Sequence, residues 1–260
     1  MAFLLVAASG AGAAEPKRIM LYGGSNTWGW AATAEATLDR RYEEHERWSG
    51  VLRQALGPDY VVIEEGRNGR TTDIPDPLLR SYFGTPQNGA AVLPERLAAH
   101  DPVDLVVLMV GTNDLIARFD RTPFRVGLGV GTLIDIVQRH QSAARPERPA
   151  ARVLVVSPPP LGDLQPEKYQ RVYAGGEAKS RELAPVLAAI AHAAGAAFLD
   201  AGTVTVSDGP DGVHLTAEAH RRLGEALAPA IRTLFASRQG SAEPERPAAP
   251  GRLDAVAHPP

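Results

Sequence analysis

Hydrophobic residues along the chain form two patterns, short apolar runs and longer stretches with helical spacing. The apolar runs are four to six residues long, and most are rich in β-branched residues. Runs of this kind are typical of strands that are buried on both faces of a parallel sheet. The pattern therefore predicts five strands, at residues 18–22, 60–64, 105–110, 152–156 and 197–200.

Between these runs, apolar residues recur every three or four positions, as they do in amphipathic helices. This spacing predicts helices at residues 48–56, 91–100, 124–140, 177–194 and 217–235. Strand and helix thus alternate, which favours a three-layer α/β/α domain with right-handed crossovers. Pro185 should kink or divide the fourth helix, because proline lacks a backbone donor and clashes with the preceding turn. Thr216 is expected to cap the last helix.

Composition narrows the function classes. With 260 residues, 44% of them hydrophobic, the chain can bury one sizeable core. Lys and Arg total 27 against 30 Asp and Glu, so a net charge of -3 provides no broad positive field for nucleic acid or an anionic membrane. The chain lacks cysteine, HExxH spacing and a GxGxxG or P-loop run, so we expect neither a metal nor a nucleotide cofactor.

The two ends of the chain differ in composition from its middle. Residues 1–16 contain an apolar stretch and several alanines, which resembles a secretory signal without its positive start. We therefore expect a periplasmic or secreted protein, with a cytoplasmic location as the alternative. Residues 237–260 are rich in proline and are expected to be disordered, which assigns residues 17–236 to the folded domain.

Residues suited to acyl transfer follow the predicted strands. Ligands of an open parallel sheet bind outside the carboxyl ends of its strands, so these loops are where chemistry is expected. Ser25 follows the first strand, Gly69 the second and Asn113 the third, while Asp211 and His214 lie beyond the last.

A serine becomes a nucleophile when a positioned base accepts its proton. Imidazole titrates near neutral pH, so His214 suits this task, and Asp211 lies three residues earlier, where it can orient the ring. The alternatives are that Ser25 caps a helix and that Asp211 belongs to an ordinary turn with a surface histidine.

The reaction also needs donors for the oxyanion that forms during attack. The side-chain amide of Asn113 and the backbone N–H of Gly69 can provide them, although both residues also suit plain turns. All these residues stand at the ends of successive strands, where the sheet brings them together, and chance seldom produces that combination.

Four runs carry a resemblance to a known family. Gly-Gly-Ser-Asn-Thr-Trp-Gly (23–29), Asn-Gly-Arg-Thr (68–71), Gly-Thr-Asn-Asp (111–114) and Asp-Gly-Val-His (211–214) resemble the four sequence blocks of SGNH (GDSL-like) hydrolases. The resemblance covers about residues 17–235. Runs at 64–72, 155–160 and 208–214 are most similar to the arylesterase, acyltransferase and perhydrolase branch.

This resemblance implies a flavodoxin-like five-stranded sheet, ester chemistry without a cofactor, and a homo-oligomer. It implies that Ser25 is the nucleophile, with His214 and Asp211 as its base and orienting acid. It also implies an oxyanion hole formed by the N–H groups of Ser25 and Gly69 and the side chain of Asn113.

Two positions depart from the family pattern. Gly24 stands where the family has Asp, and Asn26 stands where Leu is usual. The triad and the oxyanion donors are unaffected, so we expect the chemistry to be retained, with lower turnover or an altered choice of acyl group.

Aromatic and polar residues beside the predicted nucleophile are candidates for the substrate pocket. We expect a short apolar acyl pocket from Trp28, Trp30 and the loop at 71–94, which contains Tyr82 and Phe83. The same aromatic residues are equally suited to core or subunit contacts. Further predicted pocket residues are Asn68, Thr112 and Val213.

Two functions follow as hypotheses. The first is a serine esterase or acyltransferase acting on short-chain aryl, alkyl or acetylated carbohydrate esters. The second is a non-catalytic ligand-binding relative, motivated by Gly24. Glu64 and Glu65 do not suit a glycosidase pair, because adjacent residues of a strand face opposite sides. The remaining histidines considered are expected near helix ends or the surface, mostly solvated: His100, His140, His192 and His220.

Overall fold

The computed structural model describes residues 15–32 and 40–237, and a parallel sheet forms its centre. The strands are β1 (Lys17–Gly23), β2 (Tyr60–Gly66), β3 (Leu105–Met109), β4 (Arg152–Ser157) and β5 (Ala197–Asp200). Their order across the sheet is β2-β1-β3-β4-β5, the order of flavodoxin-like folds. The predicted α/β class and all five predicted strands are confirmed.

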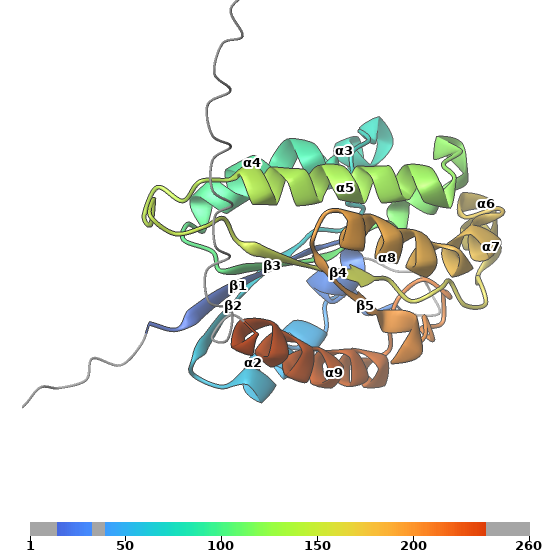
Figure 1. Ribbon diagram of the computed structural model, residues 1–260. Helices are drawn as coiled ribbons and strands as arrows, with labels where there is room; N and C mark the ends of the chain where they lie inside the picture. Colours follow the sequence, from blue (N-terminus) through green and yellow to red (C-terminus); the bar gives the residue numbers. More distant parts are fainter. Residues whose placement is uncertain (1–14, 33–39, 238–260) are drawn as a thin grey trace, which may run out of the picture.

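Helices cover both faces of the sheet (Figure 1). One face carries α2 (Trp48–Leu56) and α9 (Ala217–Ala236). The other face carries α4 (Gly89–Ala99), α5 (Pro123–Arg139) and α8 (Leu183–Ala193). The three predicted layers are therefore present, and each face of the sheet has its own hydrophobic cluster.

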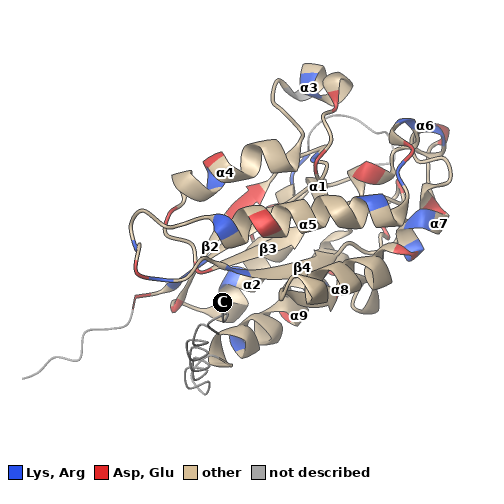
Figure 2. Cartoon of the chain, turned by 45° about the horizontal axis from the view of Figure 1, so that its top comes forward, with Lys and Arg blue, Asp and Glu red and all other residues tan. Residues whose placement is uncertain are grey.

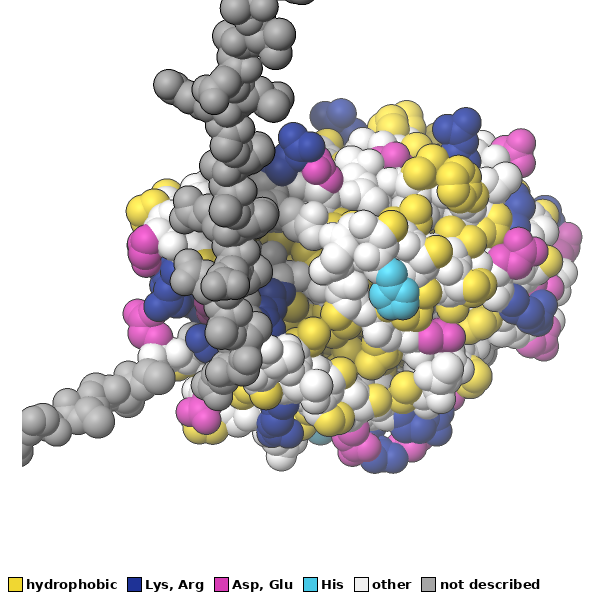
Figure 3. Space-filling view, in the orientation of Figure 1, with side chains coloured by type: hydrophobic (Ala, Val, Ile, Leu, Met, Phe, Trp, Pro, Cys, Tyr) yellow, Lys and Arg dark blue, Asp and Glu magenta, His cyan; other side chains and the backbone are white. Residues whose placement is uncertain are grey.

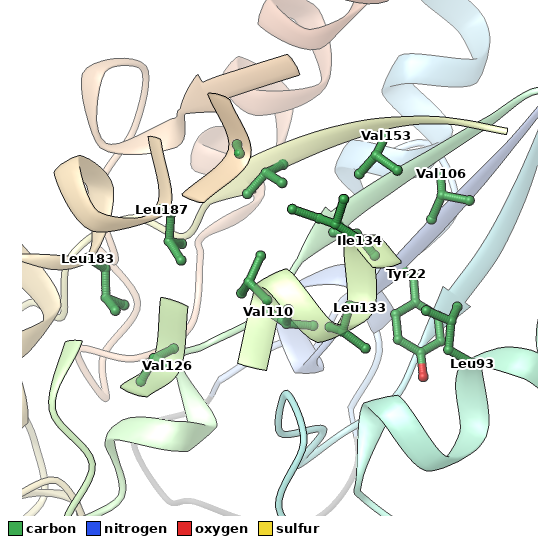
Figure 4. Packing of buried hydrophobic residues seen from close by; sticks show 14 of the residues in the cluster. Tyr22, Leu93, Val106, Val110, Val126, Leu133, Ile134, Val153, Leu183 and Leu187 are labelled. Carbon is green, nitrogen blue, oxygen red and sulfur yellow. The ribbon is translucent and has the colours of Figure 1, made fainter. Parts of the chain in front are cut away.

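The central strands are apolar on both faces because both faces are covered. In β3, Val106 and Leu108 pack into the cluster beneath α4, α5 and α8, while Leu105 and Val107 pack toward α2 and α9. Figure 4 shows the first cluster, in which Tyr22 and Val106 of the sheet lie opposite Leu93, Leu133 and other helix residues. This burial on both faces explains why the strands appear in the sequence as continuous apolar runs without alternation.

The helix predicted at 177–194 is divided, as expected for this segment, but not at the proline. It forms α7 (Gly176–Arg181) and α8, separated by Glu182. Pro185 is the third residue of α8, within the first turn, where a helix has no use for the missing N–H. The other predicted helices are observed with boundaries shifted by two residues or fewer, and Thr216 caps α9 by accepting a hydrogen bond from Ala219 N–H.

Several short helices were not predicted. They are α1 (Ser25–Trp28), α3 (Pro77–Phe83) and α6 (Glu167–Val172), together with 3₁₀ turns at Asn113–Leu115, Ala117–Phe119 and Ala201–Thr203. Segments of three to seven residues make at most two turns, so they show no periodic pattern.

The strand order creates a crevice at one point of the sheet. From β1 the chain crosses to β2 on one side and then returns to β3 on the other. The loops that leave β1 and β3 therefore separate at the carboxyl ends of these strands, the usual ligand position in such sheets. Residues 24–25 and 110–113 lie there.

Charged residues of both signs are interspersed along the chain (Figure 2), and in the view of Figure 3 hydrophobic side chains lie among charged and polar ones. Among the described residues, no helix is long and apolar enough to cross a membrane. The predicted leader and tail lie outside the described residues, apart from residues 15, 16 and 237.

Gly66, at the end of β2, supports α1 directly. A Cβ atom at this position would lie 2.2 Å from the backbone nitrogen of Trp28 and 2.5 Å from the carbonyl carbon of Thr27. Because backbone atoms cannot rotate away, we expect Gly66→Ala to displace α1 and to lower the free energy of unfolding by roughly 1–3 kcal/mol. Urea denaturation would measure the loss.

Gly131→Ala in α5 is the matched control. Its Cβ would make an ordinary contact, 3.4 Å from Cγ2 of Ile190. Alanine also favours a helix over glycine by about 1 kcal/mol, so this variant should be as stable as the wild type or more so. Equal losses in the two variants would contradict the role given to Gly66.

Candidate active site

Ser25, His214 and Asp211 form a continuous chain of hydrogen bonds. The Nδ1 atom of His214 lies 2.6 Å from Oδ2 of Asp211, and its Nε2 atom lies 2.9 Å from Oγ of Ser25. An ionised carboxylate only accepts hydrogen bonds, so Nδ1 carries the proton and Nε2 is left to accept the serine hydroxyl. The structure thus brings together the three residues that the sequence proposed for this role.

Asp211 is buried, but its charge is well satisfied. Its Oδ1 atom accepts the backbone N–H groups of Val213 and His214, each at 2.9 Å. Burial alone would raise the pKa of Asp211, but the hydrogen bonds from the ring and backbone of His214 and from Val213 outweigh it and lower the pKa. Asp211 therefore remains an anion beside the imidazole and fixes the orientation of the ring.

The turn between Asp211 and His214 requires glycine. Gly212 has φ of 68°, and a Cβ atom there would lie 2.3 Å from the carbonyl oxygen of Asp163. Glycine reaches this left-handed conformation without the penalty that side chains incur. The Asp-Gly signal in the sequence thus corresponds to a tight turn that holds the carboxylate and the imidazole together.

Ser25 is the first residue of α1 rather than its cap. The cap position belongs to Gly24, which makes no side-chain hydrogen bond, and the Ser25 hydroxyl is bound to His214 instead. The alternative of a plain helix-cap serine is therefore not what the structure shows. As the first helical residue, Ser25 has a backbone N–H without an intrahelical acceptor.

Asn113 and Gly69 lie next to the serine. Asn113 is buried, donates from Nδ2 to the carbonyl oxygen of Arg70 at 3.0 Å, and accepts from the hydroxyl of Tyr173 at 3.3 Å. One hydrogen of its amide is thus used, and the second is free to meet a ligand. Gly69 has φ of 76°, and in residues 15–32 and 40–237 its N–H has no hydrogen-bond acceptor.

Asp114 holds the loops that carry these donors against each other. It accepts the backbone N–H of Thr72 at 3.0 Å and the Thr72 hydroxyl at 2.5 Å, and Nη1 of Arg121 lies 3.2 Å away. The side chain of Asp114 is fully buried. Burial raises its pKa to about 6, although Thr72 and Arg121 oppose the shift.

A cavity of about 160 Å³ opens beside the hydroxyl of Ser25. Its walls come from α1, the loops after β2 and β3, α3 and α6. Figure 2 shows α3 and α6 at the same edge of the molecule as α1. The lining residues are Ser25, Trp30, Asn68, Gly69, Leu79, Asn113, Ile116, Tyr169, Val172, Tyr173 and His214.

The structure places only some of the predicted pocket residues at this cavity. Asn68 and Trp30 line the cavity. Trp28 instead packs against Arg41, whose Cζ atom lies 5.3 Å from the centroid of the Trp28 ring. Val213 is buried with its backbone hydrogen-bonded, and Thr112 lines a separate space of only about 10 Å³ behind Ser25. These three residues do not line the main cavity.

From the segment at 71–94, Leu79 lines the cavity. The side chain of Tyr82 is exposed, and that of Phe83 lies outside the described residues. The lining residues of α6 were missed because nothing in the sequence places this short helix over the site. Ile116 was also missed, although its position two residues after the Gly-Thr-Asn-Asp run could have indicated that it lies near the site.

Trp30 and His220 flank the site in different ways. The indole of Trp30 stacks on the imidazole of His214, with ring centroids 5.5 Å apart and planes inclined by 23°. His220 is fully buried, and burial lowers its pKa to about 3. The expectation that His220 is solvated is therefore wrong, because α9 turns this residue toward α2.

Other polar residues have structural partners. Glu64 forms ion pairs with Arg41 and Arg47, while Glu65 lies 2.7 Å from Nε2 of His100 on the opposite face of the strand. Across the described residues, no three His, Cys, Asp or Glu side chains are grouped so that they could hold a metal ion.

Comparisons with known proteins place this geometry in context. A sequence profile described as the GDSL-like Lipase/Acylhydrolase family matches residues 21–222. No curated protein sequence matches the chain. An aryl esterase of M. smegmatis is 44% identical and superposes with a TM-score of 0.79, covering 84% of this chain and 99% of its own.

Two further solved structures are similar. A carbohydrate acetylesterase of Sinorhizobium meliloti is 38% identical, with a TM-score of 0.79 and coverage of 84% of this chain and 100% of its own. A lipase/acylhydrolase of Enterococcus faecalis is 17% identical with a TM-score of 0.57, covering 84% of this chain and 96% of its own. This last similarity concerns the fold alone.

The raised pKa of Asp114 predicts a specific pH dependence of stability. Between about pH 4, near its unfolded pKa, and about pH 6, the folded protein keeps a proton that the unfolded chain has lost. The stability from this group is therefore present below pH 4 and lost as the pH rises to 6.

Relative to Asp114→Asn, the free energy of unfolding of the wild type should fall by up to about 3 kcal/mol between pH 4 and pH 7. Urea unfolding of both proteins across this range measures the difference, because groups that do not interact with residue 114 contribute equally to both. Parallel curves would contradict the raised pKa.

Proposed function

Because the chain belongs to the GDSL-like lipase/acylhydrolase family, we propose that it cleaves short-chain acyl esters through an acyl-Ser25 intermediate. That the protein is an ester hydrolase agrees with the esterases to which it is similar. The observation that carries the proposal is the hydrogen-bond chain from Asp211 through His214 to the hydroxyl of Ser25.

In the first half of the reaction, Ser25 acylates. Its Oγ attacks the carbonyl carbon of the ester while Nε2 of His214 accepts the hydroxyl proton. The tetrahedral intermediate then collapses, the bond to the alcohol oxygen breaks, and the leaving alcohol takes the proton from His214. Asp211 stabilises the imidazolium that exists between these steps.

In the second half, water attacks the acyl carbon and gives a proton to His214. The bond between the acyl carbon and Oγ breaks, and Ser25 recovers its proton from His214. The acid is released, and the enzyme returns to its initial protonation state. No redox step or external proton source is required.

Three donors are assigned to the oxyanion. They are the N–H of Ser25 at the start of α1, the N–H of Gly69 and the unused amide hydrogen of Asn113. Each belongs to a backbone or side chain that is held by other hydrogen bonds or by a turn, so little reorganisation accompanies charge development. Tyr173 assists, because its hydroxyl fixes the amide of Asn113.

The cavity supports a small substrate. Its volume of about 160 Å³ suits a short acyl group or an aryl ring, and Leu79, Ile116 and Val172 give it an apolar wall. The aryl esterase and the carbohydrate acetylesterase among the similar structures make aryl and acetylated carbohydrate esters the first substrates to test. Transfer to an alcohol or peroxide is proposed as a second outcome, because an apolar wall beside Ser25 favours binding of an organic acceptor that competes with water for the acyl group.

Hydrolysis of p-nitrophenyl acetate tests the reaction and the residue roles. Ser25→Ala and His214→Ala should each lower kcat by about six orders of magnitude. Asn113→Ala should lower it by about a hundredfold to a thousandfold, the usual effect of losing one oxyanion donor. A folded wild type without activity, or a Ser25→Ala variant with equal activity, would favour the non-catalytic ligand-binding hypothesis.

A separate experiment tests acyl transfer. Vinyl acetate and benzyl alcohol are supplied together in buffer, and acetic acid and benzyl acetate are quantified. We expect both products, with none of the ester from Ser25→Ala. Acetic acid alone would remove the transfer proposal and leave hydrolysis intact.

A further inference from the structure

The side chain of Asn26 connects the helix that carries Ser25 to the loop that carries His214. Its Nδ2 atom donates to the carbonyl oxygen of Val213 at 3.1 Å, and its Oδ1 atom accepts the N–H of Leu215 at 3.1 Å. The side chain is buried. We call this pair of hydrogen bonds the Asn26 bridge.

The Asn26 bridge binds the residues on both sides of His214. Val213 immediately precedes His214 and Leu215 immediately follows it, so the two bonds hold the backbone on both sides of the base. Asn26 in turn immediately follows Ser25. One primary amide therefore relates the backbone of the nucleophile to the backbone of the base, across 187 and 189 residues of sequence.

The backbone of Asn26 is itself anchored. Its carbonyl oxygen accepts the indole N–H of Trp48 at 3.0 Å, and Trp48 is fully buried in α2. Asn26 thus links α1, α2 and the loop before α9. A bridge fixed at three points resists movement of either catalytic segment.

Each segment is held by bonds of its own, but the bonds within the turn between Asp211 and His214 do not fix its position relative to α1. Helix α1 has only four residues and ends at Gly29 with φ of 90°, and the turn before His214 contains Gly212 with φ of 68°. A single hydrogen bond between Ser25 and His214 cannot set the geometry of two such segments. An additional constraint close to both atoms is required, and the Asn26 bridge provides one.

We propose that Asn26 is a positioning residue that sets the distance and direction between Ser25 Oγ and His214 Nε2. The inference rests on the proposed function. It also explains why this chain tolerates a residue other than the family's usual leucine at this position, since an amide forms two bonds to the base loop that an aliphatic side chain cannot form.

Asn26→Leu tests the bridge because leucine has a similar size and no hydrogen-bonding atoms. Asn26→Asp keeps an acceptor for Leu215 but replaces the donor to Val213 with an oxygen that repels the Val213 carbonyl oxygen. Ser180→Ala is the matched control, because Ser180 is also buried and its hydroxyl also makes two backbone bonds, to Leu161 N–H and Glu177 O. The control residue does not line the cavity.

The measurements are kcat and KM with p-nitrophenyl acetate, the rate at which phenylmethanesulfonyl fluoride modifies Ser25, and thermal unfolding. We expect Asn26→Leu to lower kcat and the modification rate by roughly ten- to a hundredfold, with KM nearly unchanged, because a displacement near 1 Å has this effect. Asn26→Asp should also lower both rates, and Ser180→Ala should change neither.

Combination with His214→Ala separates positioning from a general structural effect. If Asn26 acts through His214, Asn26→Leu should not lower the residual activity of His214→Ala any further. The inference would be overturned if Asn26→Leu lowered kcat by the same factor in the wild type and in His214→Ala. It would also be overturned if both folded Asn26 variants kept the wild-type kcat. An inactive wild type would instead refute the proposed function, so the two failures are distinguishable.

Discussion

The bond between His214 and Ser25 depends on a constraint that neither residue supplies, the convergence of strand ends in a parallel sheet. Ser25 begins a one-turn helix and His214 follows a tight turn, and the two residues are joined across 189 positions of the chain. Because β1 occupies the point where strand order reverses, the loop after β1 faces the loops after β2 and β3 at one edge. The Asp-Gly-Val-His turn reaches the same edge because α9 packs beside α2 on one face of the sheet. The proposed chemistry is a consequence of how the layers pack.

Two buried carboxylates near this edge show how local hydrogen bonding decides charge. Asp211 receives bonds from two backbone N–H groups and from the ring of His214, and its pKa falls despite burial. Asp114 receives bonds from Thr72 and lies near Arg121, yet burial prevails and its pKa rises to about 6. The first carboxylate is a negative charge beside the imidazole of His214, whereas the second joins two loops. In the sequence, Asp211 precedes a glycine and Asp114 follows an asparagine, and neither neighbour indicates whether the pKa of the carboxyl group falls or rises.

Much of the fold and the centre of the site could be predicted from the sequence, for physical reasons. Strands such as β3 are apolar on both faces, and Ser25, Asn113 and His214 belong to runs whose residue types suit one reaction. The walls of the cavity could not be predicted, because α3 and α6 are too short to show a period and their position over the site depends on tertiary packing. Trp28 was assigned to the pocket from its nearness in sequence, but Arg41 holds it elsewhere. The contacts of Asn26 join residues far apart in the chain, so no local sequence pattern could predict them.

The separation of the cavity wall from the reacting groups has an evolutionary consequence. Leu79 lies in α3 and Tyr169 and Val172 lie in α6, whereas the hydrogen-bonded groups come from strand-end loops that the core supports. Mutations in these two peripheral helices can reshape what enters the cavity without altering the distance between Oγ and the imidazole. Proteins with this architecture can therefore diverge in substrate range while the reacting groups stay the same.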